Sequence, residues 1–111
     1  MVRDLTMKPV LTLGGYMEQH ERAAAFGGCD GHAYSCALYL EDEPDAAGRL
    51  GGALLFVRWD EAGAAPAGHV ETPTLAYGRT KEELEGRLGA LSLFDVKAAL
   101  DEAIRNRPEG W

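Results

Sequence analysis

The spacing of hydrophobic residues along the chain changes at Gly78. Before this residue, hydrophobic and polar positions alternate in short runs, and after it hydrophobic residues recur about every 3.6 positions. Alternation is typical of strands, and the longer period is typical of helices. The pattern therefore predicts a sheet in the first part of the chain and helices in the last third.

Two helix starts are marked beyond Gly78. Thr80 and Ser92 each stand three residues before a carboxylate, and a hydroxyl in that position can accept a hydrogen bond from the third helical amide. Gly89 stands where a left-handed glycine is expected to end the first helix, and Pro108 closes the second. The predicted apolar faces are Leu84, Leu88 and Leu91 in the first helix and Val96, Ala99, Leu100, Ala103 and Ile104 in the second.

Four strands are expected before the helices, separated by turns rich in glycine, proline and aspartate. Residues 34–40 alternate as a strand does, and residues 52–59 form a short apolar run typical of a central strand buried on both faces. Residues 69–77 supply another strand, in which Pro73 cannot donate a hydrogen bond. We therefore expect this last strand to lie at an edge of the sheet or to carry a bulge.

Residues 16–26 allow two interpretations. The stretch at 18–25 is rich in alanine and in charged residues with high helix propensity, which favours a helix. The glycine-rich turn at 27–31, followed directly by the strand at 34–40, favours a hairpin and hence a strand. We predict a strand and keep the helix as the alternative.

These elements predict one α+β domain over residues 1–111, with 1–9 as a leader and 108–111 as a tail. Its antiparallel sheet of about four strands, joined as hairpins or a meander, carries the two C-terminal helices on one face. Two helices cannot cover both faces of a sheet. The second face of the central strand therefore needs a cover, supplied by the N-terminal segment or by a second copy of the chain.

Net charge and hydropathy indicate which kinds of partner the protein can have and in which compartment it is expected. The formal net charge is −7 at pH 7, which opposes condensation on a phosphate backbone, so we expect no nucleic acid partner. No stretch approaches the roughly twenty apolar residues that span a bilayer, and the N-terminus lacks the pattern of a signal peptide. We therefore expect a cytoplasmic protein with no membrane partner, in which both cysteines are free thiols.

Three residues invite a metal interpretation. Cys29, His32 and Cys36 offer two thiolates and an imidazole, a donor set that can suit tetrahedral zinc. A structural zinc site normally has four ligands in paired spacings, and only three are evident here. In strand geometry Cys36 points into the core, away from a Cys29 in the turn. The sequence therefore favours two unconnected thiols and no cofactor.

A second candidate site consists of histidines and carboxylates. In strand geometry Glu18 and His20 share one face, as do His69 and Glu71. Adjacent strands would bring these four side chains together for acid–base chemistry or for binding of a metal. The alternative is an exposed polar face of an antiparallel sheet, which is how most such alternation arises.

The segment from Thr74 to Leu84 contains the sequence Gly78-Arg79-Thr80-Lys81-Glu82-Glu83 between a strand and a helix. It resembles HicB-like antitoxin domains, in which a similar G-x-T-x-E-E turn leads from a strand into a helix packed on an antiparallel sheet. The sheet of that family continues after its helix, whereas a second helix is predicted here. Neither a basic patch nor a ribbon–helix–helix extension is visible to make the DNA and toxin contacts that the resemblance implies.

The function that best fits these patterns is a non-enzymatic binding or assembly module that acts as a homodimer or with another protein partner. The alternatives are a small metal-dependent or acid–base enzyme that uses His20, His69, Glu18 and Glu71, and an antitoxin-type domain.

Overall fold

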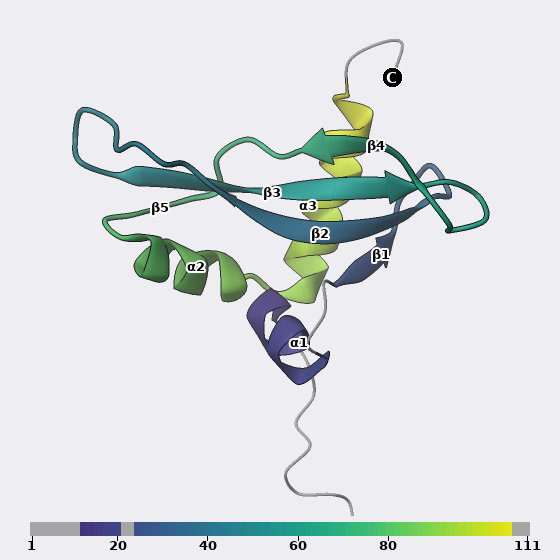
Figure 1. The fold of residues 1–111 in the computed structure, drawn as a ribbon, viewed down its shortest axis with the longest axis horizontal. Helices are drawn as coiled ribbons and strands as arrows, with labels where there is room; N and C mark the ends of the chain where they lie inside the picture. Colours follow the sequence, from purple (N-terminus) through teal and green to yellow (C-terminus); the bar gives the residue numbers. More distant parts are fainter. Residues whose placement is uncertain (1–11, 21–23, 108–111) are drawn as a thin grey trace, which may run out of the picture.

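The computed structural model describes residues 12–20 and 24–107. In chain order their elements are α1 (Leu13–His20), β1 (Ala25–Gly27), β2 (Ala33–Leu40), β3 (Leu50–Trp59), β4 (Pro66–Glu71), β5 (Ala76–Gly78), α2 (Lys81–Gly89) and α3 (Leu93–Arg105) (Figure 1). The strands form one antiparallel sheet with β1, β2, β3 and β4 side by side in that order and with β5 also paired to β3. This confirms the predicted α+β class.

Strand β3 is the centre of the sheet, as predicted. It pairs with β2 along one edge and with β4 and β5 along the other. Leu54 and Phe56 point toward the helices and are fully buried, whereas Leu55, Val57 and Trp59 on the other face are half-buried. Both faces of the strand are therefore apolar, but only one is covered completely.

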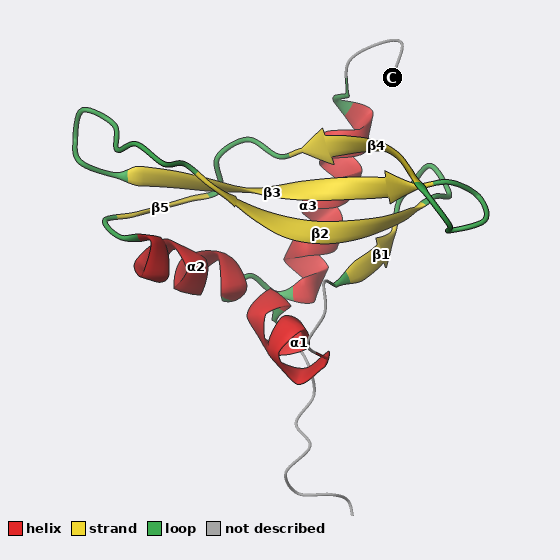
Figure 2. Ribbon diagram, in the orientation of Figure 1, coloured by secondary structure: helices red, strands yellow, loops and turns green. Residues whose placement is uncertain are grey.

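The helices lie on one face of the sheet (Figure 2). The amide of Glu83 donates to the Thr80 hydroxyl over 3.0 Å, and the amide of Asp95 donates to the Ser92 hydroxyl over 2.9 Å. Both predicted helix caps are thus confirmed. The core consists of side chains from the helices and from the covered face of the sheet, among them Leu13, Tyr34, Cys36, Leu54, Phe56, Val70, Leu84, Leu88, Val96, Leu100 and Ile104.

The prediction of a strand over residues 16–26 is wrong for its first part. Residues 13–20 form α1, because the helix docks on the junction between α2 and α3: Leu13 is fully buried, and its amide donates to the Leu91 carbonyl over 2.8 Å. Residues 21–23 lie outside the described residues, and Ala25–Gly27 form the short strand β1. The hairpin between β1 and β2 is present, with Ala25 opposite Ser35.

Glycine 89 does not end α2 in the left-handed conformation. The helix runs through Gly89, and the capping residue Ala90 has a φ of −78°. A Cβ atom on Gly14 would lie 3.1 Å from the carbonyl oxygen of Gly89, so the two glycines let α1 and α2 approach closely. Glycine at position 89 therefore serves the packing of α1 against α2. The spacing of hydrophobic residues in the sequence does not reveal this contact.

The strand predicted over residues 69–77 is split into β4 and β5. Thr72 follows β4, and its hydroxyl accepts a hydrogen bond from the Leu54 amide over 3.0 Å. Pro73 comes next and cannot donate to β3, so the chain leaves the ladder before it returns as β5. The expected edge position is confirmed, because β4 is the last strand in the sheet order.

No helix among the described residues combines the length and the apolar character that crossing a bilayer requires.

Candidate functional site

The face of the sheet opposite the helices is the largest feature that the fold leaves uncovered. Among residues 12–20 and 24–107, no helix or strand lies over it (Figures 1 and 2). Strand alternation and register place ten side chains there, which we call the open face: Ser35, Ala37, Tyr39, Ala53, Leu55, Val57, Trp59, His69, Glu71 and Tyr77.

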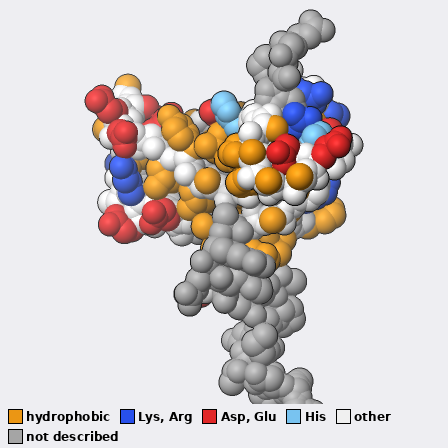
Figure 3. Space-filling model, turned by 45° about the vertical axis from the view of Figure 1, so that its right-hand side comes forward, with side chains coloured by type: hydrophobic (Ala, Val, Ile, Leu, Met, Phe, Trp, Pro, Cys, Tyr) orange, Lys and Arg blue, Asp and Glu red, His pale blue; other side chains and the backbone are white. Residues whose placement is uncertain are grey.

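Most of the open face is apolar. Tyr39 is 51% exposed and Tyr77 is 40% exposed, although large hydrophobic side chains are usually more deeply buried. Ala37 lies opposite Leu55, and Ser35 lies opposite Val57, so the centre of the face has no charged side chain on these two strands. Figure 3 shows hydrophobic side chains gathered in the middle of the molecule, with charged side chains toward both ends.

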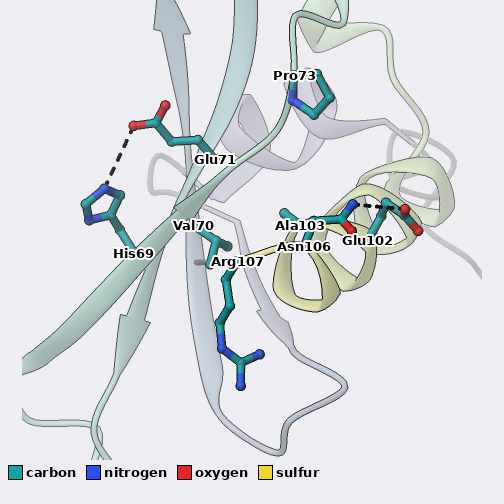
Figure 4. Close-up of a pocket in the computed structure, with 8 residues that line it drawn as sticks. All are labelled: His69, Val70, Glu71, Pro73, Glu102, Ala103, Asn106 and Arg107. Carbon is teal, nitrogen blue, oxygen red and sulfur yellow. Dashed lines mark hydrogen bonds and ion pairs between the residues drawn. The ribbon is translucent and has the colours of Figure 1, made fainter. Parts of the chain in front are cut away.

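A groove runs between the edge strand β4 and the last turns of α3 (Figure 4). Its volume is about 490 Å³, and it is lined by His69, Val70, Glu71, Pro73, Glu102, Ala103, Asn106 and Arg107. Val70 and Ala103 are buried and form its apolar part, while the Asn106 amide donates to Glu102 over 3.1 Å. The size lies within the range of sites for small ligands.

Of the acid–base candidates whose side chains the structure describes, Glu18 is not brought close to His69 and Glu71. His69 and Glu71 do share a face of β4, with His69 Nε2 and Glu71 Oε2 3.8 Å apart. Glu18 is exposed on α1, which lies at the opposite end of the view in Figure 1 from β4. We expected Glu18 and His20 to share one face of a strand. Residues 13–20 are helical instead, and positions two apart do not face the same side of a helix. The side chain of His20 lies outside the described residues.

His32 belongs to a polar network rather than to a cluster of thiols. It lies beside Arg58, whose Nε is 3.5 Å from a carboxylate oxygen of Asp30. The same carboxylate accepts a hydrogen bond from the Tyr34 hydroxyl over 2.7 Å and one from the His32 amide over 3.1 Å. Burial of the hydroxyl, together with the Asp30 carboxylate beside it, raises the pKa of Tyr34. The network ties the turn between β1 and β2 to the end of β3.

The two cysteines are free, and they differ in environment. Cys36 is 1% exposed on the covered face of β2, and its burial raises the pKa of its thiol to about 12. Cys29 is exposed, and its amide donates to the Asp101 carboxylate over 3.0 Å. No group of three or more His, Cys, Asp or Glu side chains in the described part of the chain is arranged to hold a metal ion.

Sequence reasoning missed a group of arginines around Tyr77. Arg49, Arg79 and Arg87 line a cavity of about 180 Å³ together with Tyr77 and Glu83. Arg49 directly precedes β3, Arg79 directly follows β5, and Arg87 is in the last turn of α2, so the pairing of β5 with β3 brings them together. No local motif marks them, because they are separated in the sequence by up to 38 positions.

The local structure implied by the HicB resemblance is present, since β5 leads through Gly78 and the Thr80 cap into α2. The next element is α3 and not a further strand, in contrast to that family. Comparison with profiles of protein families, with curated proteins and with solved structures gave no match.

Proposed function

We propose that this protein is a non-enzymatic binding and assembly module that acts as a homodimer by burying its open face against a second copy. The observation that supports this proposal is the apolar surface opposite the helices, where Leu55, Val57 and Trp59 are half-buried beside the exposed rings of Tyr39 and Tyr77. A monomer that left this surface in water would lose the free energy that burial of apolar area provides. Contiguous apolar patches of several hundred Å² usually mark interfaces.

The net charge of the chain is compatible with such an assembly. A formal charge of −7 keeps a small domain in solution and opposes further aggregation. A closed twofold dimer buries the apolar surface of both copies and leaves none for a third.

Sedimentation equilibrium tests the proposal. We expect a species of twice the 12.0 kDa chain mass at micromolar concentration and dissociation on dilution. Tyr39 is 51% exposed on the open face, so its replacement by lysine should shift the equilibrium to the monomer. Phe94 is 83% exposed on α3, away from the open face, so Phe94→Lys is the matched control and should leave the dimer intact. A 12.0 kDa species throughout the wild-type concentration series would refute the proposal.

The groove along β4 supports a second candidate, a small acid–base enzyme that uses His69 and Glu71. His69 Nε2 and Glu71 Oε2 lie 3.8 Å apart, and both residues line a cavity of about 490 Å³. They are 62% and 56% exposed, so water is not excluded from them as acid–base catalysis usually requires. NMR titration with small apolar esters checks this candidate: saturable shifts at Val70 and Ala103 would support it, and their absence would remove it.

A further inference from the structure

Strand β4 is the last strand of the sheet, and its outer edge has no partner strand among the described residues. The ladder with β3 fixes which of its backbone groups point outward. The Thr72 amide donates to the Leu54 carbonyl over 3.0 Å, so these two residues form a hydrogen-bonded pair. Such pairs alternate with non-hydrogen-bonded pairs in an antiparallel ladder. The N–H and C=O groups of His69 and Glu71 therefore point away from β3.

These outward backbone groups are accessible to another strand. No hydrogen bond joins them to a residue in the described part of the chain. His69 and Glu71 also line the groove between β4 and α3, so the space beside the edge is not filled by side chains (Figure 4). A row of unpaired N–H and C=O groups is a template for pairing with a further strand.

We propose that the free edge of β4 pairs antiparallel with the same edge of a second copy, about a twofold axis at Val70. In this register His69 of each copy lies opposite Glu71 of the other, and each such pair exchanges two backbone hydrogen bonds. The contact does not use the open face, so it goes beyond the homodimer proposed above. Together the two contacts join two open-face dimers into a tetramer.

Charge complementarity identifies the second copy as the occupant. Within one chain, His69 Nε2 and Glu71 Oε2 lie 3.8 Å apart on the same face of β4. The second copy sets another imidazole directly opposite each carboxylate, so that each carboxylate lies between two imidazoles. Directly opposed residues of unlike charge stabilise an antiparallel pair, and an imidazole can donate a hydrogen bond in either protonation state.

The neighbouring registers lack this complementarity. Outward-pointing residues must face one another, so the alternatives are shifted by two residues. One alternative sets His69 opposite its own copy. The other sets Glu71 opposite its own copy and His69 opposite Pro73, which has no amide proton. An axis parallel to the strands makes them parallel and places each residue beside its own copy, so like groups again meet.

The other charged residues of the groove do not add a second like-charged cluster. Glu102 accepts hydrogen bonds from Arg105 over 2.9 Å and from Asn106 over 3.1 Å, both within its own chain. Arg107 supplies a positive charge to the same groove. The two copies therefore bring charges of both signs to this side of the contact.

The apolar part of the groove lies at the proposed axis. In this register Val70 lies opposite its own copy in a non-hydrogen-bonded pair, in which Cβ atoms approach to about 4.5–5.5 Å. Val70 and Ala103 line the groove, whose volume of about 490 Å³ leaves room for an added strand beside β4. The edge thus offers hydrogen-bond partners, complementary charges and an apolar contact to the same copy of β4.

The full-length Tyr39→Lys variant isolates the edge contact, because that substitution is directed at the open face. The edge contact is short and therefore weak, so we expect a monomer to become a dimer between about 10 µM and about 1 mM in sedimentation equilibrium. In this background His69→Glu sets carboxylates opposite one another and should raise the dissociation constant about tenfold. Ala98 is exposed on α3 outside the groove, so Ala98→Glu is the matched control and should leave the constant unchanged.

Two further variants and one measurement test the register. Exchange of the two residues, His69→Glu with Glu71→His, restores the alternation and should return the dissociation constant to within about threefold of the Tyr39→Lys chain. Glu71→Pro removes an outward N–H but no ladder bond to β3, and it should abolish the contact. Hydrogen exchange should show the amides of His69 and Glu71 gaining protection as concentration rises, with that of Val70 unchanged.

The outcomes separate the edge contact from the open-face dimer. A Tyr39→Lys chain that stays at 12.0 kDa, in a wild type that forms a dimer, would overturn the edge contact and retain the proposed function. A wild-type dimer that Tyr39→Lys leaves intact and His69→Glu dissociates would support the edge contact and overturn the proposed function. Protection of the His69 and Glu71 amides in a monomeric chain would show another occupant and would also overturn the edge contact.

Discussion

Arg58 Nη2 donates a hydrogen bond to His32 Nε2 over 2.7 Å. A ring nitrogen that accepts a hydrogen bond carries no proton, so the imidazole has its proton on Nδ1. That nitrogen lies 3.1 Å from the carbonyl oxygen of Trp59 and donates to it. His32 therefore connects the side chain of one β3 residue to the backbone of the next, at the end of the central strand.

We predict that His32→Ala lowers the free energy of unfolding by about 1–3 kcal/mol, because the partly buried Arg58 and the Trp59 carbonyl both lose a partner. Urea unfolding at pH 7 measures the change. His69 provides the matched control: it is 62% exposed, and His69→Ala should change stability by less than about 0.5 kcal/mol. Equal effects of the two substitutions would contradict the structural role of His32.

The carboxyl of Asp30 predicts a pH dependence of stability. Partial burial raises its pKa, but hydrogen bonds from the Tyr34 hydroxyl and the His32 amide, with the charge of Arg58, outweigh burial and hold the pKa below the usual 3.8. The folded state then binds fewer protons than the unfolded state in this range. The stabilisation is fully present above the unfolded pKa and is lost as pH falls through the folded pKa.

We therefore expect Asp30→Asn to cost about 1–3 kcal/mol at neutral pH, because it removes a charged hydrogen-bond acceptor. The difference between wild type and variant should shrink as the pH is lowered below 3.8. Urea unfolding at pH 7, 5 and 3 follows it. A difference that grew on acidification would show that the shift has the opposite sign.

The C-terminal helices should be required for folding. Leu88 and Leu100 are fully buried at the centres of their helix faces, so Leu88→Ala and Leu100→Ala should each destabilise the protein by about 2–4 kcal/mol. Urea unfolding provides the measurement. Losses below about half a kcal/mol for both would mean that the helices do not pack on the sheet as described.

The two thiols should differ in reactivity. Cys29 is exposed and should react with a thiol reagent in the native protein, whereas Cys36 is buried with a raised pKa and should react only on unfolding. Stopped-flow labelling with and without urea separates the two. Protection of both thiols that a chelator relieves would indicate a metal site, and a disulfide between them would contradict the expected reducing compartment.

The parts of the fold that could be predicted are those in which local pattern and tertiary contact agree. The caps at Thr80 and Ser92 depend only on neighbouring residues. The run at 52–59 is apolar on both faces, so it is expected at the centre of the sheet whichever elements pack on it. Helix α1 could not be predicted. Its residues can form a helix or a strand, and the contact with residues near Leu91, far along the chain, decides between them.

The candidate sites were less predictable for the same reason. His69 and Glu71 share a face because two positions along a strand always do, which is local geometry. The contact of His32 with Arg58, and the gathering of arginines around Tyr77, depend on strand register. Register is set by the whole sheet, so no spacing in the sequence indicates these neighbours.

The docking site of α1 is built by residues near the other end of the chain. Leu13 binds the carbonyl of Leu91, Thr12 forms a bridge with Ser92, and Gly14 lies against Gly89. During synthesis α1 leaves the ribosome first, yet the surface on which it docks exists only after the junction of α2 and α3 has emerged. Closure of so long a loop costs entropy before the contact compensates for it, so docking of α1 is expected to be a late folding step. Until α1 docks, the Leu13 side chain lacks the core contacts that bury it in the folded protein.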